Sequence, residues 1–120
     1  MIMNNSPEPK KGEIWMVNFN PVMGAEISKI RPAGVVSENS IGKLPLRIVV
    51  PITDWQERYK RSVWFTFLKQ SDANGLSKDS GADSFQVKSV SIGRFQRKAG
   101  KVASQELTSI IDAIALCIGI

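Results

Sequence analysis

The 120-residue sequence contains no histidine and a single cysteine, Cys117. The absence of histidine removes the commonest metal ligand and the commonest general base, and one cysteine excludes an internal disulfide framework. We therefore expect no metal site and no cofactor. Any proton transfer that this protein carries out has to use another kind of side chain.

Long apolar runs are missing as well. No segment has the ~18 consecutive apolar residues that a membrane-spanning helix needs, and residues 1–11 lack the apolar core of a signal peptide. These absences predict a soluble, cytoplasmic protein with no membrane partner. Residues 1–11 are polar and contain Pro7 and Pro9, which favours a disordered N-terminal lead, and residues 12–120 fit a single domain.

Acidic residues are outnumbered by basic ones. Sixteen lysines and arginines against eleven aspartates and glutamates give a formal net charge of +5. A basic surface attracts an anionic partner such as nucleic acid, although basic proteins without such a partner are common. One loop combines three cations, Arg58, Lys60 and Arg61, with the aromatic side chains of Trp55 and Tyr59.

Short apolar and β-branched runs alternate with turn residues along most of the chain. Runs of this kind predict the strands of a small sheet. The expected strands are residues 13–19, 33–37, 46–52, 62–68 and 85–92.

The apolar period changes near the C-terminus. Ser104 is a suitable N-cap, and five apolar residues recur at helical spacing after it: Leu107, Ile110, Ile111, Ile114 and Ile118. Several short strands followed by one amphipathic helix predict a mostly-β (α+β) domain, built as a small curved barrel or sandwich.

Arg31 is the first candidate functional residue because it enters a predicted strand directly before Pro32. Proline fixes its own φ and restricts the preceding residue to extended geometry, so the Arg31 backbone is held more firmly than that of an ordinary loop residue. A guanidinium held in this way can be aimed at a phosphate, since it is planar, always charged and able to make two parallel hydrogen bonds. The alternative is a surface arginine that closes a turn.

Several short motifs follow one another in an order and spacing that resemble those of one protein family. The motifs are Gly12-Glu13-Ile14-Trp15, Asn20-Pro21 with Gly24 and Glu26, Arg31-Pro32 with Val35-Val36-Ser37, Pro51-Ile52-Thr53, Asp79-Ser80, Gln86-Val87-Lys88, and Arg94 before Gly100-Lys101. Over residues 11–119 the chain is similar to the MazF/PemK family of toxin ribonucleases. The resemblance implies an SH3-like β-barrel with a C-terminal helix that forms a homodimer. It also implies a metal-independent endoribonuclease that cuts single-stranded RNA (mRNA) at short sequences and is neutralised by a cognate antitoxin.

Three residues have candidate chemical roles, two of them through the resemblance and Glu26 through its position five residues before Arg31. In metal-free RNA cleavage the substrate's own 2′-hydroxyl attacks the adjacent phosphorus, so the enzyme has to orient the phosphate, stabilise its added charge and handle two protons. Arg31 matches the family's arginine, and Thr53 matches a hydroxyl residue that can donate to the same phosphate, although threonine is also a good β residue. Glu26 can accept the 2′-hydroxyl proton, and its alternative is an ion pair with Lys29 or Arg31.

The sequence departs from the family pattern at two places. Ala25 stands where some members carry a polar or basic residue, and Asp83 and Phe85 stand where others carry an arginine and an aspartate. Gln86 is then a neutral donor to a phosphate or a base edge, or an outward-facing strand residue. The other expected substrate contacts are cations that attract the RNA backbone and rings that stack on bases or pack on the barrel. They are Lys29, Lys88, Arg58, Lys60, Arg61, Trp55 and Tyr59.

Two other functions stay open from the sequence. The same barrel occurs in toxins resembling the CcdB gyrase poisons, which act through their C-terminal end, and the ending 118–120 partly matches theirs but lacks the tryptophan. The second is a member that only binds RNA or an antitoxin. An acidic extended segment of an antitoxin is expected to compete with RNA for the same groove, because both are anionic.

Overall fold

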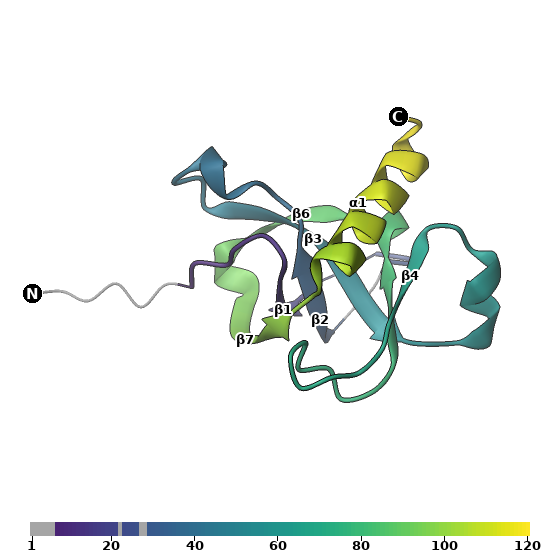
Figure 1. The fold of residues 1–120 in the computed structure, drawn as a ribbon. Helices are drawn as coiled ribbons and strands as arrows, with labels where there is room; N and C mark the ends of the chain where they lie inside the picture. Colours follow the sequence, from purple (N-terminus) through teal and green to yellow (C-terminus); the bar gives the residue numbers. More distant parts are fainter. Residues whose placement is uncertain (1–6, 22, 27–28) are drawn as a thin grey trace, which may run out of the picture.

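The computed structural model describes residues 7–21, 23–26 and 29–120, and Figure 1 shows their arrangement. The elements within this part are β1 (Glu13–Asn18), β2 (Ile30–Val35), η1 (Asn39–Ile41), β3 (Leu46–Asp54), η2 (Glu57–Arg61), β4 (Phe65–Leu68), β5 (Ser80–Asp83), η3 (Ser84–Gln86), β6 (Lys88–Ser91), η4 (Ile92–Arg94), β7 (Phe95–Lys101) and α1 (Ser104–Ile118). The four η elements are short 3₁₀ turns. In Figure 1, α1 lies across the strands, and the connection that carries η2 projects from one side.

The strands form one sheet in the order β4-β5-β3-β2-β1-β7, and β6 also pairs with β3. β3 organises this sheet because it changes partner along its length. Residues 46–49 pair with β6 and residues 52–54 pair with β5, while the opposite edge pairs with β2. Pro51 falls where the partner changes from β6 to β5, which is where a residue without a backbone N–H costs the sheet least.

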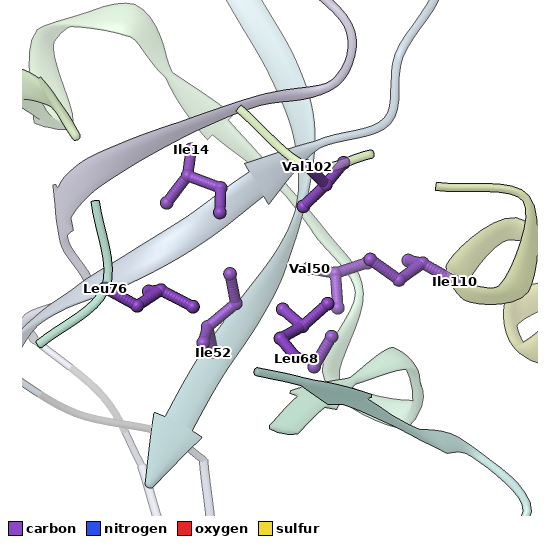
Figure 2. Close-up of a cluster of buried hydrophobic side chains, with 8 residues drawn as sticks. Ile14, Val50, Ile52, Leu68, Leu76, Val102 and Ile110 are labelled. Carbon is purple, nitrogen blue, oxygen red and sulfur yellow. The ribbon is translucent and has the colours of Figure 1, made fainter. Parts of the chain in front are cut away.

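The hydrophobic core consists of two clusters on the two faces of the sheet. The consecutive residues Val49 and Val50 belong to different clusters, as successive side chains of a strand point to opposite faces. The cluster beneath α1 is drawn in Figure 2, where Ile110 extends from the helix toward Val50. Leu107 and Ile114 pack against the same cluster, which confirms this part of the helical stripe, whereas Ile118 is 62% exposed. Burial of a side chain such as Ile110 stabilises the fold by about 1.5 to 3 kcal/mol.

The helix begins one residue away from the expected cap. Ser104 is its first helical residue and Ala103 is the N-cap, whose backbone N–H donates to Oε1 of Glu106 at 3.0 Å. Among the described residues, no helix has the length and apolarity needed to cross a membrane.

The predicted fold class is confirmed: the protein is mostly β, with one C-terminal helix. The sheet is not closed, since its end strands β4 and β7 do not pair with each other. The strand pattern was wrong in three places. Residues 85–92 contain η3, the short strand β6 and the start of η4, whereas β5 and β7 were not predicted.

The N-terminal segment differs from the expected disordered lead where the structure describes it. Pro9 is fully buried, and its carbonyl oxygen accepts a hydrogen bond from Nε of Arg47 at 2.9 Å. Lys11 binds the turn after β2, with its backbone N–H on Oδ1 of Asn39 and its Nζ paired with Glu38. Residues 7–11 are therefore packed on the domain, and residues 1–6 of the expected lead lie outside the described residues.

Candidate active site

Arg31 on β2 and Thr53 on β3 lie side by side. The two strands pair antiparallel with Ala33 opposite Pro51, so the continued register brings position 31 opposite position 53. The Nη1 of Arg31 donates to Oγ1 of Thr53 at 3.4 Å, and both residues are partly buried. The structure therefore brings together the two residues that the sequence placed first in its candidate site.

These two residues line a cavity of about 210 Å³, which we call the Arg31 cavity. It lies where β1, β2, β3 and β7 meet the connection between β4 and β5. Its lining residues are Met16, Ile30, Arg31, Pro32, Ile52, Thr53, Asp54, Gly75, Leu76, Ser77, Ser80, Arg97 and Ala99. The Asp54 carboxylate in this lining forms an ion pair with Nζ of Lys78 at 3.1 Å.

One wall of the Arg31 cavity is held in place by close backbone contacts. Asn74 is buried, and its Oδ1 accepts hydrogen bonds from the backbone N–H groups of Ser71 and Leu76. Gly75 has φ +68°, and a Cβ there would overlap the carbonyl oxygen of Ala99 on β7. The wall is thus a turn seated directly on β7, in a position that only glycine permits.

Glu26, Gln86 and Lys88 line a different cavity of about 210 Å³, the Gln86 cavity, together with Phe19, Pro51, Phe85 and Val87. Oε2 of Glu26 lies 3.6 Å from Nζ of Lys88, and Oε1 accepts from the backbone N–H of Met23 at 3.0 Å. Glu26 therefore forms an ion pair with Lys88, a partner that the sequence did not suggest.

A buried acid orients Gln86. Asp83 is 7% exposed, and its carboxylate accepts from Nε2 of Gln86 and from the backbone N–H of Phe85, each at 3.2 Å. Burial raises the pKa of Asp83, and these hydrogen bonds offset part of the increase. The pKa of the Cys117 thiol is raised mainly by burial, and the nearby Asp83 carboxylate raises it further.

The aromatic residues of the η2 connection pack on the domain. Trp55 meets Tyr59 and Phe67 edge to face, with ring centroids 5.7 and 5.0 Å apart, and Tyr59 stacks on Phe65 at 3.8 Å. These rings line a more open cavity of about 540 Å³, the Trp55 cavity, together with Lys60. The rings are therefore anchored by packing on the domain, which the sequence left open as the alternative to stacking on bases. They also line a surface cavity.

The other predicted cations lie away from the Arg31 cavity, Lys29 before β2 and the remaining three on η2. Lys29 is exposed, has φ +69°, and its backbone N–H donates to Oδ1 of Asn20 at 3.0 Å. The guanidinium of Arg58 lies 5.5 Å from the ring centroid of Tyr59, and Nζ of Lys60 pairs with Glu57 at 2.7 Å. Arg61 is exposed at the end of η2. None of these cations lines the Arg31 cavity.

Sequence reasoning missed Arg97, which lines the Arg31 cavity from β7. The signal was weak because β7 is a polar strand without apolar alternation, so nothing placed Arg97 near Arg31. In the part of the chain that the structure describes, no three cysteine or acidic side chains gather closely enough to hold a metal ion.

The fold is that of known bacterial toxins. The MazF toxin of Deinococcus radiodurans matches the structure with a TM-score of 0.76 and 21% identity, covering 93% of this chain and 97% of that one. A mycobacterial endoribonuclease solved in complex with its cognate antitoxin matches with a TM-score of 0.70 and 15% identity, covering 94% of this chain and 97% of that one.

The sequence comparison defines the family. Residues 10–118 match the model of the PemK-like, MazF-like toxins of type II toxin–antitoxin systems. The endoribonuclease MazF9 of Mycobacterium tuberculosis is 31% identical over 113 residues, which cover 89% of this chain and 93% of that protein. The chain belongs to the PemK-like, MazF-like toxin family, and the family predicted from the sequence is confirmed.

Proposed function

We propose that this chain is the toxin of a toxin–antitoxin pair and acts as a metal-independent endoribonuclease on single-stranded RNA. The observation that carries the proposal is the hydrogen bond between Arg31 and Thr53 at the edge of the Arg31 cavity. Two kinds of phosphate donor, a fixed cation and a hydroxyl, meet there on adjacent strands. Membership of the toxin family and the name of the relative, endoribonuclease MazF9, support the same reaction.

The proposed reaction is an internal transfer at phosphorus. The 2′-hydroxyl of the substrate loses its proton to a base, its oxygen attacks the adjacent phosphorus, and the bond to the 5′-oxygen breaks. The 5′-oxygen takes a proton from water, which gives a 2′,3′-cyclic phosphate and a 5′-hydroxyl. Arg31 binds the non-bridging oxygens, whose negative charge grows in the transition state. Because the oxygen of Thr53 accepts from Arg31, its O–H is left to donate to the same phosphate.

Glu26 is the proposed acceptor of the 2′-hydroxyl proton. Its carboxylate lies against Lys88 in the Gln86 cavity and not in the lining of the Arg31 cavity. Pro51, which precedes Thr53 by two residues on the same face of β3, lines the Gln86 cavity too, so the Glu26 carboxylate is on the side of the sheet to which the Thr53 side chain points. RNA bound there would also meet the Gln86 amide, whose nitrogen donates to Asp83.

The remaining predicted residues form the proposed grip on the RNA chain. Lys88 lines the Gln86 cavity and Lys29 precedes β2, while Trp55 and Tyr59 offer ring edges and faces beside the Trp55 cavity. Arg58, Lys60 and Arg61 add positive charge to the same connection. Phosphate contacts of this kind carry affinity without reading sequence.

A cognate antitoxin and a second copy of the chain complete the proposal. An acidic, extended antitoxin segment would bind the same cationic surface as RNA, in a cytoplasmic homodimer. One related structure is an endoribonuclease in complex with its cognate antitoxin, which supports this partner class. RNA and such an antitoxin segment are therefore expected to exclude each other, and a stable ternary complex would refute the shared site.

One structural feature favours the alternative function, that of a gyrase-binding toxin that acts through its C-terminal end. Ile118, the last residue of α1, is 62% exposed and Ile120, which follows the helix, is 91% exposed, so an apolar end of the chain is presented to solvent. A gyrase supercoiling assay separates the two functions. Inhibition that disappears when residues 118–120 are removed would select the gyrase-binding function.

The test of the proposed function uses purified protein and end-labelled, single-stranded RNA of mixed sequence in EDTA. We expect discrete cuts whose products carry 2′,3′-cyclic phosphate and 5′-hydroxyl ends. Binding of the RNA with no cut products would select the non-catalytic member, and cleavage abolished by EDTA would refute the metal-independent reaction.

A further inference from the structure

Gly81 on β5 stands between two side chains that project from the same face of the sheet. It pairs with Thr53 of β3 on one side and with Phe67 of β4 on the other. Residues directly opposite one another point to the same face, so a Cβ added at Gly81 would lie between those of Thr53 and Phe67. The register of β2 with β3 brings Arg31 opposite Thr53, so the proposed phosphate site is the next step of the same row.

The space above Gly81 is taken by the ring of Trp55. A Cβ added at Gly81 would lie 3.1 Å from Cε3 of Trp55 and 3.0 Å from Cδ1 of Phe65, so any side chain at position 81 would push these rings away. Trp55 follows Thr53 by two residues, which puts both side chains on one face of the chain. Gly81, over which the Trp55 ring stands, is one strand spacing, about 4.8 Å, from Thr53.

Trp55 is held in place but keeps part of its surface exposed. It is half-buried and meets Tyr59 and Phe67 edge to face, at 5.7 and 5.0 Å. Tyr59 is already stacked on Phe65 with the ring planes 6° apart, whereas no recorded ring within the described ranges lies parallel to Trp55. Trp55 is therefore the better placed of the two rings to stack on a flat ligand, and its fixed position lowers the entropic cost of binding.

We propose that Gly81 is a positioning residue that places Trp55 beside the phosphate site, where the ring stacks on the base of a nucleotide next to the scissile phosphate. This inference rests on the proposed function. The phosphate site and the ring lie on one face of the sheet in neighbouring positions, so a short stretch of single-stranded RNA meets both. A base that is stacked there restrains the sugar and the phosphate attached to it, which orients the bond to be cut.

Stacking has a recognisable consequence. Every base has a π face, so the site should tolerate any base but not the absence of a base. Loss of this one stack should weaken RNA binding about 5- to 150-fold. A general loosening of the fold would instead weaken binding to the same extent whether or not the base is present.

The experiment measures the dissociation constant of an RNA with a 2′-deoxy nucleotide at the cut, which prevents cleavage. An abasic nucleotide then replaces each position in turn. In the wild type we expect about 5- to 150-fold weaker binding when the base is missing from one of the two nucleotides that flank the scissile phosphate. Trp55→Leu should bind the intact RNA more weakly by a similar factor and should lose the sensitivity to that abasic nucleotide. The same sensitivity in Trp55→Leu as in the wild type would overturn the inference.

Gly81→Ala tests the positioning role while Trp55 is still present. The displaced ring should stack less well, so the effect of the abasic nucleotide should become at least about threefold smaller. Gly34→Ala is the matched control, because Gly34 on β2 has no atom within 4 Å of an added Cβ and no positive φ. That variant should keep the full wild-type effect, and equal effects in the two glycine variants would overturn the inference.

The wild-type protein gives a second readout, which does not depend on the folding of a variant. Stacking of a base on tryptophan quenches the fluorescence of the indole. At saturation, the intact RNA should quench the tryptophan fluorescence more than the RNA without the base at the sensitive position. Equal quenching by the intact RNA and by RNAs that are abasic on either side of the cut would overturn the inference.

The outcome remains separable from that of the proposed function, because binding is measured on an RNA that is not cut. If the wild type leaves all RNA intact, the nuclease proposal fails, and an abasic scan of a bound RNA still tests the stack. A position at which Trp55→Leu loses the abasic effect then supports it. The same abasic effects in Trp55→Leu and in the wild type at every position would overturn it.

Discussion

Arg31 and Thr53 are 22 residues apart in the sequence, yet the Nη1 of one donates to the Oγ1 of the other at 3.4 Å. The pairing of β2 with β3 produces this contact, because Ala33 lies opposite Pro51 and the next positions continue the register. The bond uses a lone pair of the hydroxyl and leaves its proton available. Under the proposed function, both side chains therefore donate to one phosphate.

The Thr53 hydroxyl can be removed with little change of shape. Thr53→Val should lower kcat about 10- to 100-fold, because a hydrogen bond to a charged group is worth about 1.5 to 3 kcal/mol. Thr53→Ser keeps the hydroxyl and should stay within about threefold of the wild type. Single-turnover cleavage rates measure the difference, and a Thr53→Val enzyme as fast as Thr53→Ser would exclude the hydroxyl from the reaction.

Glu26 has a testable role that does not depend on its ion pair with Lys88. General base catalysis contributes about 10² to 10⁴ in rate, so Glu26→Gln should lower kcat by at least about 100-fold with little change in KM. Lys88→Gln separates the two functions of the pair, since it removes the cation and leaves the carboxylate. If Glu26→Gln changes only KM, the carboxylate positions RNA and does not accept the proton.

The turn at Gly75 supports the wall of the Arg31 cavity. Gly75→Ala combines a left-handed φ with overlap on the carbonyl oxygen of Ala99, so we expect a loss of more than ~2 kcal/mol in unfolding free energy. Gly119→Ala is the matched control, since Gly119 has φ +79° with no atom within 4 Å of an added Cβ. That variant should lose only about 1 kcal/mol. Urea unfolding compares them, and equal losses would mean that the contact with β7 contributes nothing.

Glu13 predicts a pH dependence of stability. Burial raises its pKa, but hydrogen bonds from Lys98, Trp15 and the backbone N–H of Lys10 outweigh burial and lower the pKa below the ordinary value of 4.5. As pH falls, the unfolded chain therefore binds the proton first. The stability from the ionised carboxylate is present above pH 4.5 and is lost as pH falls through the folded-state pKa.

The matching variant is Glu13→Gln. Because Glu13 accepts charge-assisted hydrogen bonds and its side chain is only 14% exposed, the variant should be about 1 to 3 kcal/mol less stable than the wild type at pH 7. The difference should shrink below pH 4.5. Glu57→Gln removes an exposed pair and should change stability by less than ~1 kcal/mol. A loss of unfolding free energy in Glu13→Gln that is the same at about pH 7 and about pH 3 would contradict this account.

The sequence predicted the parts of the fold that depend on local pattern. The β-branched run in β3 and the helical spacing of Ile110 and Ile114 both mark elements whose apolar faces meet the core. β5 was missed because its side chains are small. Gly81 faces the rings of Trp55 and Phe65, and an added Cβ would lie 3.1 and 3.0 Å from them. That requirement comes from distant residues and leaves no periodic signal.

The candidate site, too, was predictable from the sequence only in part. Arg31 and Thr53 were found through motifs that belong to adjacent strands, and the structure joins them. Arg97 was not found, since only the pairing of β7 with β1 brings it to the cavity. Lys88 was expected to bind substrate, but its ion pair with Glu26 depends on how a loop returns to β6, which no short motif encodes.

The measurement that tests the central claim most directly is the single-turnover cleavage rate of Arg31→Ala in EDTA, on an RNA that the wild type cuts. We predict a fall of about 100- to 1,000-fold, as for the loss of one well-placed donor to a transition-state oxyanion, with an unchanged circular dichroism spectrum. A folded Arg31→Ala protein that cleaves the RNA at the wild-type rate would contradict the account.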